Sequence, residues 1–240
     1  MQLDGMIFDL DGTLTDTFSV CFVAFREALH AFTGRYFSDG EILAQFGPSE
    51  EGMLQRWLPD HWDDCLRLYL AAYEREHRRI ARTFPGIDVA LDLLRERGIR
   101  LAVVTGKGRR SAAISLAQLD LARYFDCIET GAPEGSIKPR CIQRVLERWG
   151  VPPNRVAYLG DVPSDVEASR AVGVVPLAAA WETRSDADAL RVLRPLAVFG
   201  AVPEFIQWIR DTVERRADRA PQAATGSPAT ANPFRQEAGD

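Results

Sequence analysis

The chain has 240 residues, 46% of them hydrophobic and 26% charged, with a formal net charge of −5. This composition is that of a folded globular protein, and the length suits one large domain or one domain with a smaller module. The acidic balance argues against a protein dedicated to nucleic acids or membrane surfaces, so we expect neither kind of partner.

Features of secreted, membrane and zinc proteins are missing from the sequence. The longest apolar run, Val174–Trp181, is interrupted by Pro176 and is far shorter than the roughly 20 residues that span a bilayer. Residues 1–5 have neither the basic start nor the apolar region of a secretory signal. The four cysteines have no CxxC spacing, which predicts no disulfide framework and no zinc knuckle. We therefore expect a cytoplasmic protein with reduced thiols.

Short apolar runs with few polar residues predict strands that are buried on both faces of a parallel sheet. The runs are Met6–Phe8, Leu101–Val104, Arg155–Leu159 and Val174–Ala180, with Phe125–Glu129 and Leu196–Phe199 as weaker candidates. Apolar residues at helical spacing lie between them, over 87–94 before Gly98 and over 142–149 before Gly150, and 201–213 would form the last helix. This alternation predicts an α/β fold, a doubly wound parallel sheet with right-handed crossovers.

Residues 16–84 interrupt the alternation, because they contain helical periodicity and no convincing strand. Aromatic and leucine side chains form one stripe from Phe18 to Phe32 and a second stripe from Trp62 to Tyr73, which predicts packing between helices. We expect a core domain over 1–15 and 85–216 with a helical module inserted at 16–84. Residues 217–240 are rich in Ala, Pro, Gly, Ser and Thr, which predicts a disordered tail.

Acidic side chains follow the first predicted strand. Asp9 and Asp11 are two positions apart at its end, and Gly12 permits a turn whose backbone N–H groups can face an anion. Ligands of open α/β sheets bind beyond the carboxyl ends of the strands, where this turn is expected.

Other predicted strands end in a similar way. Thr105-Gly106-Lys107 follows the second, and Asp161 and Asp165 follow the run that ends at Leu159. Lys138 begins a predicted helix, from which its ammonium could reach the same crevice. Clustered carboxylates repel one another, and a hard divalent cation such as Mg²⁺ resolves this repulsion while also binding phosphate. The residues therefore predict a phosphate crevice with a carboxylate available to attack phosphorus.

The order DxDGT, Thr, Lys-Pro and GDxxxD resembles the four motifs of the haloacid dehalogenase (HAD) superfamily of phosphohydrolases. The resemblance covers roughly residues 5–210, and the insertion after the first motif matches the family's small α-helical cap. The segments Phe8–Leu14 and Val104–Lys107 are similar to the phosphoglycolate phosphatase and bacterial pyrophosphatase branch. Asp11 and Asp161 favour phosphate over halide chemistry, because the dehalogenases of the superfamily lack an acid at the first of these positions.

The resemblance implies a role for each of these residues. Asp9 would be the nucleophile, Asp11 the general acid and base, and Lys138 would neutralise developing charge. Thr105 would hold the phosphoryl group in a phosphate cradle that also includes Gly12, Thr13, Gly106 and Lys107. Mg²⁺ would be bound by Asp9, by the Asp11 backbone carbonyl and by Asp161, and Asp165 would complete the metal site by orienting the ligands or Lys138.

Several other classes of protein share parts of this pattern. A Walker P-loop would need Gly at position 101 and Ser or Thr at 108, where the chain has Leu101 and Gly108. A phosphoacceptor signalling domain does not explain the helical insertion. A non-catalytic ligand-binding descendant would be expected to have lost a motif residue, and none is lost. A pyrophosphatase and a phosphosugar mutase remain open, because the same motifs serve both.

Substrate choice is expected to depend on the inserted module and on the second motif. Phe46–Ser49 is a candidate loop facing the crevice, and Lys107, Arg109 and Arg110 could meet a second anionic group, although basic residues at a helix start are often simply solvated. We expect a small phosphorylated metabolite as the partner, with phosphoglycolate first and pyrophosphate next. The protein is expected to be a monomer or homodimer.

Overall fold

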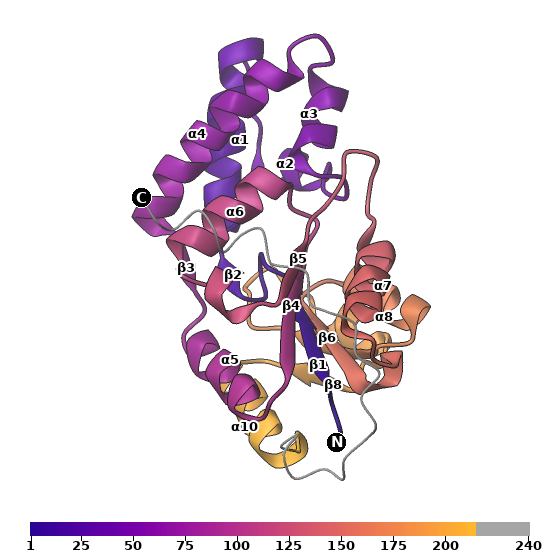
Figure 1. Ribbon diagram of the computed structural model, residues 1–240. Helices are drawn as coiled ribbons and strands as arrows, with labels where there is room; N and C mark the ends of the chain where they lie inside the picture. Colours follow the sequence, from indigo (N-terminus) through magenta and orange to yellow (C-terminus); the bar gives the residue numbers. More distant parts are fainter. Residues whose placement is uncertain (215–240) are drawn as a thin grey trace.

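Six strands form one sheet in the order β5-β4-β1-β6-β7-β8, and every neighbouring pair is parallel (Figure 1). In this computed structural model, which describes residues 1–214, they are β1 (Gly5–Phe8), β4 (Arg100–Val104), β5 (Cys127–Glu129), β6 (Val156–Gly160), β7 (Val175–Ala179) and β8 (Ala197–Phe199). The four predicted strands and the two weaker candidates are all present. The predicted doubly wound α/β fold is therefore confirmed.

Helices cover both faces of this sheet. They are α5 (Ile87–Glu96), α6 (Arg109–Gln118), α7 (Lys138–Trp149), α8 (Pro163–Val172), α9 (Ala187–Val192) and α10 (Val202–Thr212), with 3-10 turns η1 (Ala122–Tyr124) and η2 (Pro153–Arg155). Because side chains alternate along a strand, Met6 and Phe8 of β1 pack with α5 and α10, while Ile7 packs with α7 on the other face. In Figure 1, α5 and α10 lie on one side of the sheet and α7 and α8 on the other.

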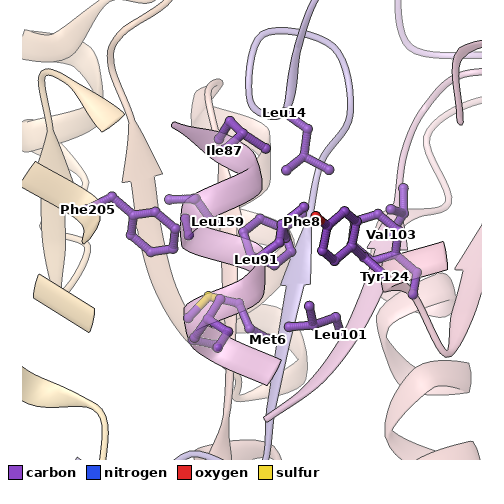
Figure 2. Close-up of a cluster of buried hydrophobic side chains, with 14 of the residues drawn as sticks. Met6, Phe8, Leu14, Ile87, Leu91, Leu101, Val103, Tyr124, Leu159 and Phe205 are labelled. Atoms are coloured by element: carbon purple, nitrogen blue, oxygen red, sulfur yellow. The ribbon is translucent and has the colours of Figure 1, made fainter. Parts of the chain in front are cut away.

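The larger core cluster surrounds Phe8, whose side chain is fully buried (Figure 2). Its ring meets the edges of Phe125 and Phe205 at centroid distances of 6.3 and 6.2 Å. Figure 2 shows Leu91 of α5 and Leu159 of β6 in the same cluster. This packing fixes the strand that leads directly to Asp9.

Strand β1 is the point at which the strand order reverses. From β1 the chain goes to β4 and β5 on one side, and then to β6, β7 and β8 on the other. In a parallel sheet such a switch opens a crevice beyond the carboxyl end of the strand. The fold therefore places the residues after β1, β4 and β6 around one crevice.

Beyond one end of the sheet lies a group of four helices, which we call the helical module: α1 (Phe18–Thr33), α2 (Asp39–Leu43), α3 (Glu50–Trp57) and α4 (Trp62–Ile80) (Figure 1). The two predicted stripes form its own apolar cluster, with Phe22 and Phe25 from α1 packed with Tyr69 and Tyr73 from α4.

Two short strands connect the helical module to the rest of the chain. β2 (Thr15–Asp16) pairs antiparallel with β3 (Arg82–Thr83). The expectation of no strand within 16–84 was wrong at β3, because a two-residue strand carries no detectable period. The proposed domain boundaries near 16 and 84 fall at this pair and stay a prediction. The predicted tail, 217–240, and the last two residues of the predicted core domain lie outside the described residues.

Within residues 1–214, no helix is both long enough and apolar enough to cross a membrane. Cys21, Cys65, Cys127 and Cys141 are all buried as free thiols.

Helix α5 offers a matched test of the core. Leu91 is fully buried, whereas Val89 on the same helix is 46% exposed. We expect Leu91→Ala to lower the free energy of unfolding by about 2–5 kcal/mol, because it leaves a cavity beside Phe8. Val89→Ala should change it by less than about 0.5 kcal/mol. Urea unfolding measures both, and equal losses would contradict this assignment of the core.

Candidate functional site

The turn after β1 brings the first acidic motif against the end of β6. The Leu10 carbonyl accepts from the backbone N–H groups of Leu14 and Thr15 at 2.9 and 3.0 Å, which closes the turn. Gly12 has a φ of +77°, and a Cβ there would lie 2.3 Å from Oδ2 of Asp161. Both the backbone conformation and the close approach therefore require glycine at position 12.

Lys138 joins two of the carboxylates. Its Nζ lies 2.6 Å from Oδ2 of Asp9 and also contacts Oδ1 of Asp165. The Tyr158 hydroxyl donates to that same Asp165 oxygen at 3.2 Å. Lys138 is the first residue of α7 and precedes Pro139, as the sequence predicted. Four different elements thus hold one buried ion-pair network.

Three carboxylates of this region form a compact group. Asp9, Asp161 and Asp165 each offer an oxygen within 4.8 Å of the others, and all three residues are buried. Thr13 donates its hydroxyl to Oδ1 of Asp161 at 3.1 Å. This oxygen-rich donor set suits a hard divalent cation.

Burial and charge shift the titration of this group. Burial raises the pKa of Asp9 to about 6; Lys138 opposes this rise and Asp165 adds to it. Burial also holds the pKa of Asp161 well above its ordinary value, reinforced by the charges of Asp9 and Asp165. Burial disfavours the charge on Lys138, but the carboxylates of Asp165 and Asp9 outweigh it and raise its pKa. The site thus holds more negative charge than Lys138 offsets.

The Asp11 side chain has different partners. The Thr17 hydroxyl donates to Oδ1 of Asp11, and Nζ of Lys107 lies 3.2 Å from its Oδ2. The same ammonium lies 3.3 Å from Sγ of Cys21 and 4.5 Å from the centre of the Tyr73 ring, both in the helical module. Burial disfavours the Lys107 charge, but Asp11 and the other groups around the ammonium together outweigh it, and the pKa of Lys107 lies well above its ordinary value.

Glu50, the first residue of α3, is a site residue that the sequence interpretation missed. Its carboxylate is buried and accepts from the Gly108 backbone N–H, from the Ser111 hydroxyl at 2.6 Å and from the Tyr69 hydroxyl at 3.4 Å. It also lies 3.5 Å from Nζ of Lys107. The sequence does carry an indication of it. Positions 50, 53, 54 and 57 share the inward face of a helix, and Glu50 is the charged residue on that face.

A cavity of about 430 Å³ lies between the helical module and the carboxyl end of the sheet. Most predicted site residues line it, namely Asp9, Asp11, Thr105, Gly106, Lys107, Lys138 and Asp161. Gly12, Thr13 and Asp165 are buried behind this lining, where Thr13 and Asp165 contact Asp161 and Lys138. The structure therefore brings the four motifs together, and the chemical role of each residue stays a prediction.

The residues proposed for substrate choice separate into two groups. Phe46, Gly47 and Pro48 line the cavity, as expected of the predicted loop. Arg109 and Arg110 are exposed and are not among its lining residues. Lys107 lines it, but its ammonium lies against Asp11 and Glu50.

Comparison with known proteins supports the same interpretation. The family model for haloacid dehalogenase-like hydrolases, which compares sequences, matches residues 6–179 of this chain. The chain is 29% identical to the pyrophosphatase PpaX of Bacillus pumilus, over 80% of this chain and 90% of the relative. It is 30% identical to a phosphoglycolate phosphatase of Pseudomonas savastanoi, over 73% of this chain and 69% of the relative.

The fold is also that of solved structures. CbbY from Rhodobacter sphaeroides, solved in complex with phosphate, superposes with a TM-score of 0.73 at 21% identity, over 85% of this chain and 96% of CbbY. The family match spans more than half of the chain and includes all four motifs in full. The chain therefore belongs to the haloacid dehalogenase-like hydrolases.

Proposed function

We propose that this hydrolase is a Mg²⁺-dependent phosphatase that cleaves a small phosphomonoester through an aspartyl-phosphate on Asp9. The observation that carries the proposal is the Asp9 carboxylate, which lines the cavity while Lys138 holds its second oxygen at 2.6 Å. The names of the relatives, phosphoglycolate phosphatase and pyrophosphatase, support a phosphorylated small molecule as substrate.

The acidic group fits a divalent cation. Asp9 and Asp161 would hold it, with Asp165 orienting Lys138, and the Asp11 backbone carbonyl is a further proposed ligand. When bound, such an ion offsets the carboxylate charge and polarises the phosphoryl oxygens. The raised pKa values of Asp9 and Asp161 are consistent with this assignment, because burial and neighbouring carboxylates disfavour their negative charge and a bound cation would offset both effects.

In the first chemical step, Oδ1 of Asp9, which accepts from the Leu10 backbone N–H at 2.7 Å, attacks phosphorus and the bond from phosphorus to the leaving oxygen breaks. Asp11 donates a proton to that oxygen, so that the alcohol leaves neutral. In the second step Asp11 accepts a proton from water, the water oxygen attacks phosphorus, and the bond to Asp9 breaks to release phosphate. Lys138 and the Thr105 hydroxyl would hold the phosphoryl oxygens throughout.

Two alternatives share this site. A pyrophosphatase would differ only in having phosphate as the leaving group, and a phosphosugar mutase would pass the phosphoryl group to a sugar instead of water. The products distinguish them, since the mutase converts a sugar phosphate without net release of phosphate. A non-catalytic regulator would bind phosphorylated ligands without turnover.

Asp9→Asn tests the nucleophile. We expect it to abolish phosphate release from p-nitrophenyl phosphate in the presence of Mg²⁺, because an amide oxygen is too weak a nucleophile to form the covalent intermediate. A colorimetric assay with wild type and variant, with Mg²⁺ and with chelator, measures this. Turnover by a folded Asp9→Asn variant at the wild-type rate would rule out Asp9 as the nucleophile.

Asp11→Asn tests the general acid and base. We expect kcat/KM, which reports transfer of the phosphoryl group to Asp9, to fall by about 10²–10⁴-fold for an alkyl phosphate, because the leaving alcohol then departs without a proton. The loss should be smaller for p-nitrophenyl phosphate, whose leaving group needs no protonation. Equal losses on both substrates would contradict the assigned role.

The metal site predicts a pH-dependent stabilisation. The pKa of Asp9 is about 6 in the folded protein, against an ordinary value of 3.8. Without metal, the folded state therefore loses stability as the pH rises from about 3.8 to about 6, because ionising Asp9 costs more in the folded than in the unfolded chain. Mg²⁺ binds the ionised form, so it should raise Tm clearly at pH 7.5 and much less at pH 5.

Thermal unfolding with MgCl₂, against NaCl of equal ionic strength, measures this shift. Asp161→Asn should remove most of the Mg²⁺ effect at pH 7.5. An equal Tm shift at both pH values, or one that survives Asp161→Asn, would show that the ion acts elsewhere.

A further inference from the structure

The side of the cavity formed by the helical module is apolar. It is lined by Phe18, Phe25, Leu43, Phe46, Met53 and Tyr69. Leu43 and Phe46 are 44% and 39% exposed, although large apolar side chains normally avoid water. The Phe46 ring stacks on Phe18 at a centroid distance of 6.3 Å, so a ring surface already covers this wall. Such a surface gains free energy when an apolar group displaces water from it.

Both cations that line the cavity are already paired with carboxylates. Among the described residues that line it, the cations are Lys107 and Lys138. Lys138 contacts the carboxylates of Asp9 and Asp165, and Lys107 contacts those of Asp11 and Glu50. Once a metal ion and a phosphoryl group occupy the acidic end, neither lysine has charge left for a second anion.

Glu50 makes the side of the cavity formed by the helical module unfavourable for an anion. Its carboxylate lines the cavity from the helical side and is only 6% exposed. A carboxylate or second phosphate of the substrate would therefore meet a like charge in a poorly solvated space.

One further cation approaches the aromatic wall from outside. The Arg184 guanidinium lies 5.8 and 5.4 Å from the ring centres of Phe18 and Phe22, and pairs with Glu182 at 2.9 Å. It covers these rings, is not among the residues lining the cavity, and has its own buried carboxylate partner.

We propose that the substrate's leaving group is uncharged and largely apolar, and that it packs against Phe46 and Phe18. This inference rests on the proposed phosphatase function and narrows its substrate class. It departs from the expectation of a phosphoglycolate-like or pyrophosphate substrate, since each of those carries a second anionic group. The phosphorus–oxygen ester bond breaks, Asp11 supplies the proton, and a neutral alcohol leaves.

Three primary alkyl phosphates of similar intrinsic reactivity test this: benzyl phosphate, glycerol 1-phosphate and phosphoglycolate. We expect kcat/KM for benzyl phosphate to exceed that for phosphoglycolate by about tenfold or more, with glycerol 1-phosphate between them. Inorganic pyrophosphate is assayed alongside and should be a poor substrate.

Three variants locate the effect. Phe46→Ala should lower the ratio of benzyl phosphate to phosphoglycolate kcat/KM by about tenfold, whereas Tyr36→Ala, which removes a 73% exposed ring outside the cavity, should leave this ratio unchanged. Glu50→Gln should move the ratio toward phosphoglycolate, because it removes the like charge and relieves one partner of Lys107.

Each outcome has a defined meaning. The inference would be overturned, while the phosphatase function stands, if phosphoglycolate or pyrophosphate were hydrolysed as well as benzyl phosphate. The same holds if glycerol 1-phosphate were a better substrate than benzyl phosphate. An unchanged ratio in Phe46→Ala would overturn the assigned wall. No phosphate release from any compound, p-nitrophenyl phosphate included, would overturn the proposed function and this inference with it.

Discussion

The repulsion among carboxylates at the carboxyl end of β1 is the constraint on which the site depends. Asp9 and Asp165 share Lys138, and Asp11 and Glu50 share Lys107. Asp161 accepts from Thr13 but has no ion pair with a lysine among residues 1–214. The unbalanced charge therefore centres on the group that includes Asp161, which is where a divalent cation would restore neutrality. The sheet topology creates this concentration, because β1 and β6 end side by side at the switch point.

The same charge arrangement connects the helical module to the chemistry. Lys107 follows β4, yet it contacts Cys21, Glu50 and Tyr73 of the module as well as Asp11. Movement of the helices away from the sheet would therefore withdraw Glu50 from Lys107 and change the surroundings of Asp11. In the proposed mechanism, such a movement of the helical module would expose the cavity to water and disturb Asp11 together, and its return would reverse both effects.

How much could be predicted from the sequence depended on the range of the interactions. The strands and the four motifs were found because a parallel sheet collects its strand ends at one edge, so position in the chain is enough to group Asp9, Thr105 and Asp161. The partners of Lys107 in the helical module were not found, because they come from helices distant in sequence whose packing has no local signal. Glu50 stood on an apolar helix face, but a single helix pattern does not reveal what that face meets. The short β2–β3 pair was missed for a similar reason. Its two-residue strands pair where the two ends of the helical module meet, and strands this short show no periodicity in the sequence.

The proposed mechanism requires that Asp9 carries the phosphoryl group, and covalent trapping can detect this intermediate. Wild-type protein turning over substrate with Mg²⁺ is quenched and treated with borohydride, which reduces an aspartyl-phosphate to homoserine, and the peptides are mapped by mass spectrometry. We expect homoserine at position 9 in protein that was turning over substrate, and no homoserine there in protein without substrate. Reduction at another carboxylate would contradict the role of Asp9. So would steady turnover that leaves no modified residue under conditions in which an acyl phosphate accumulates.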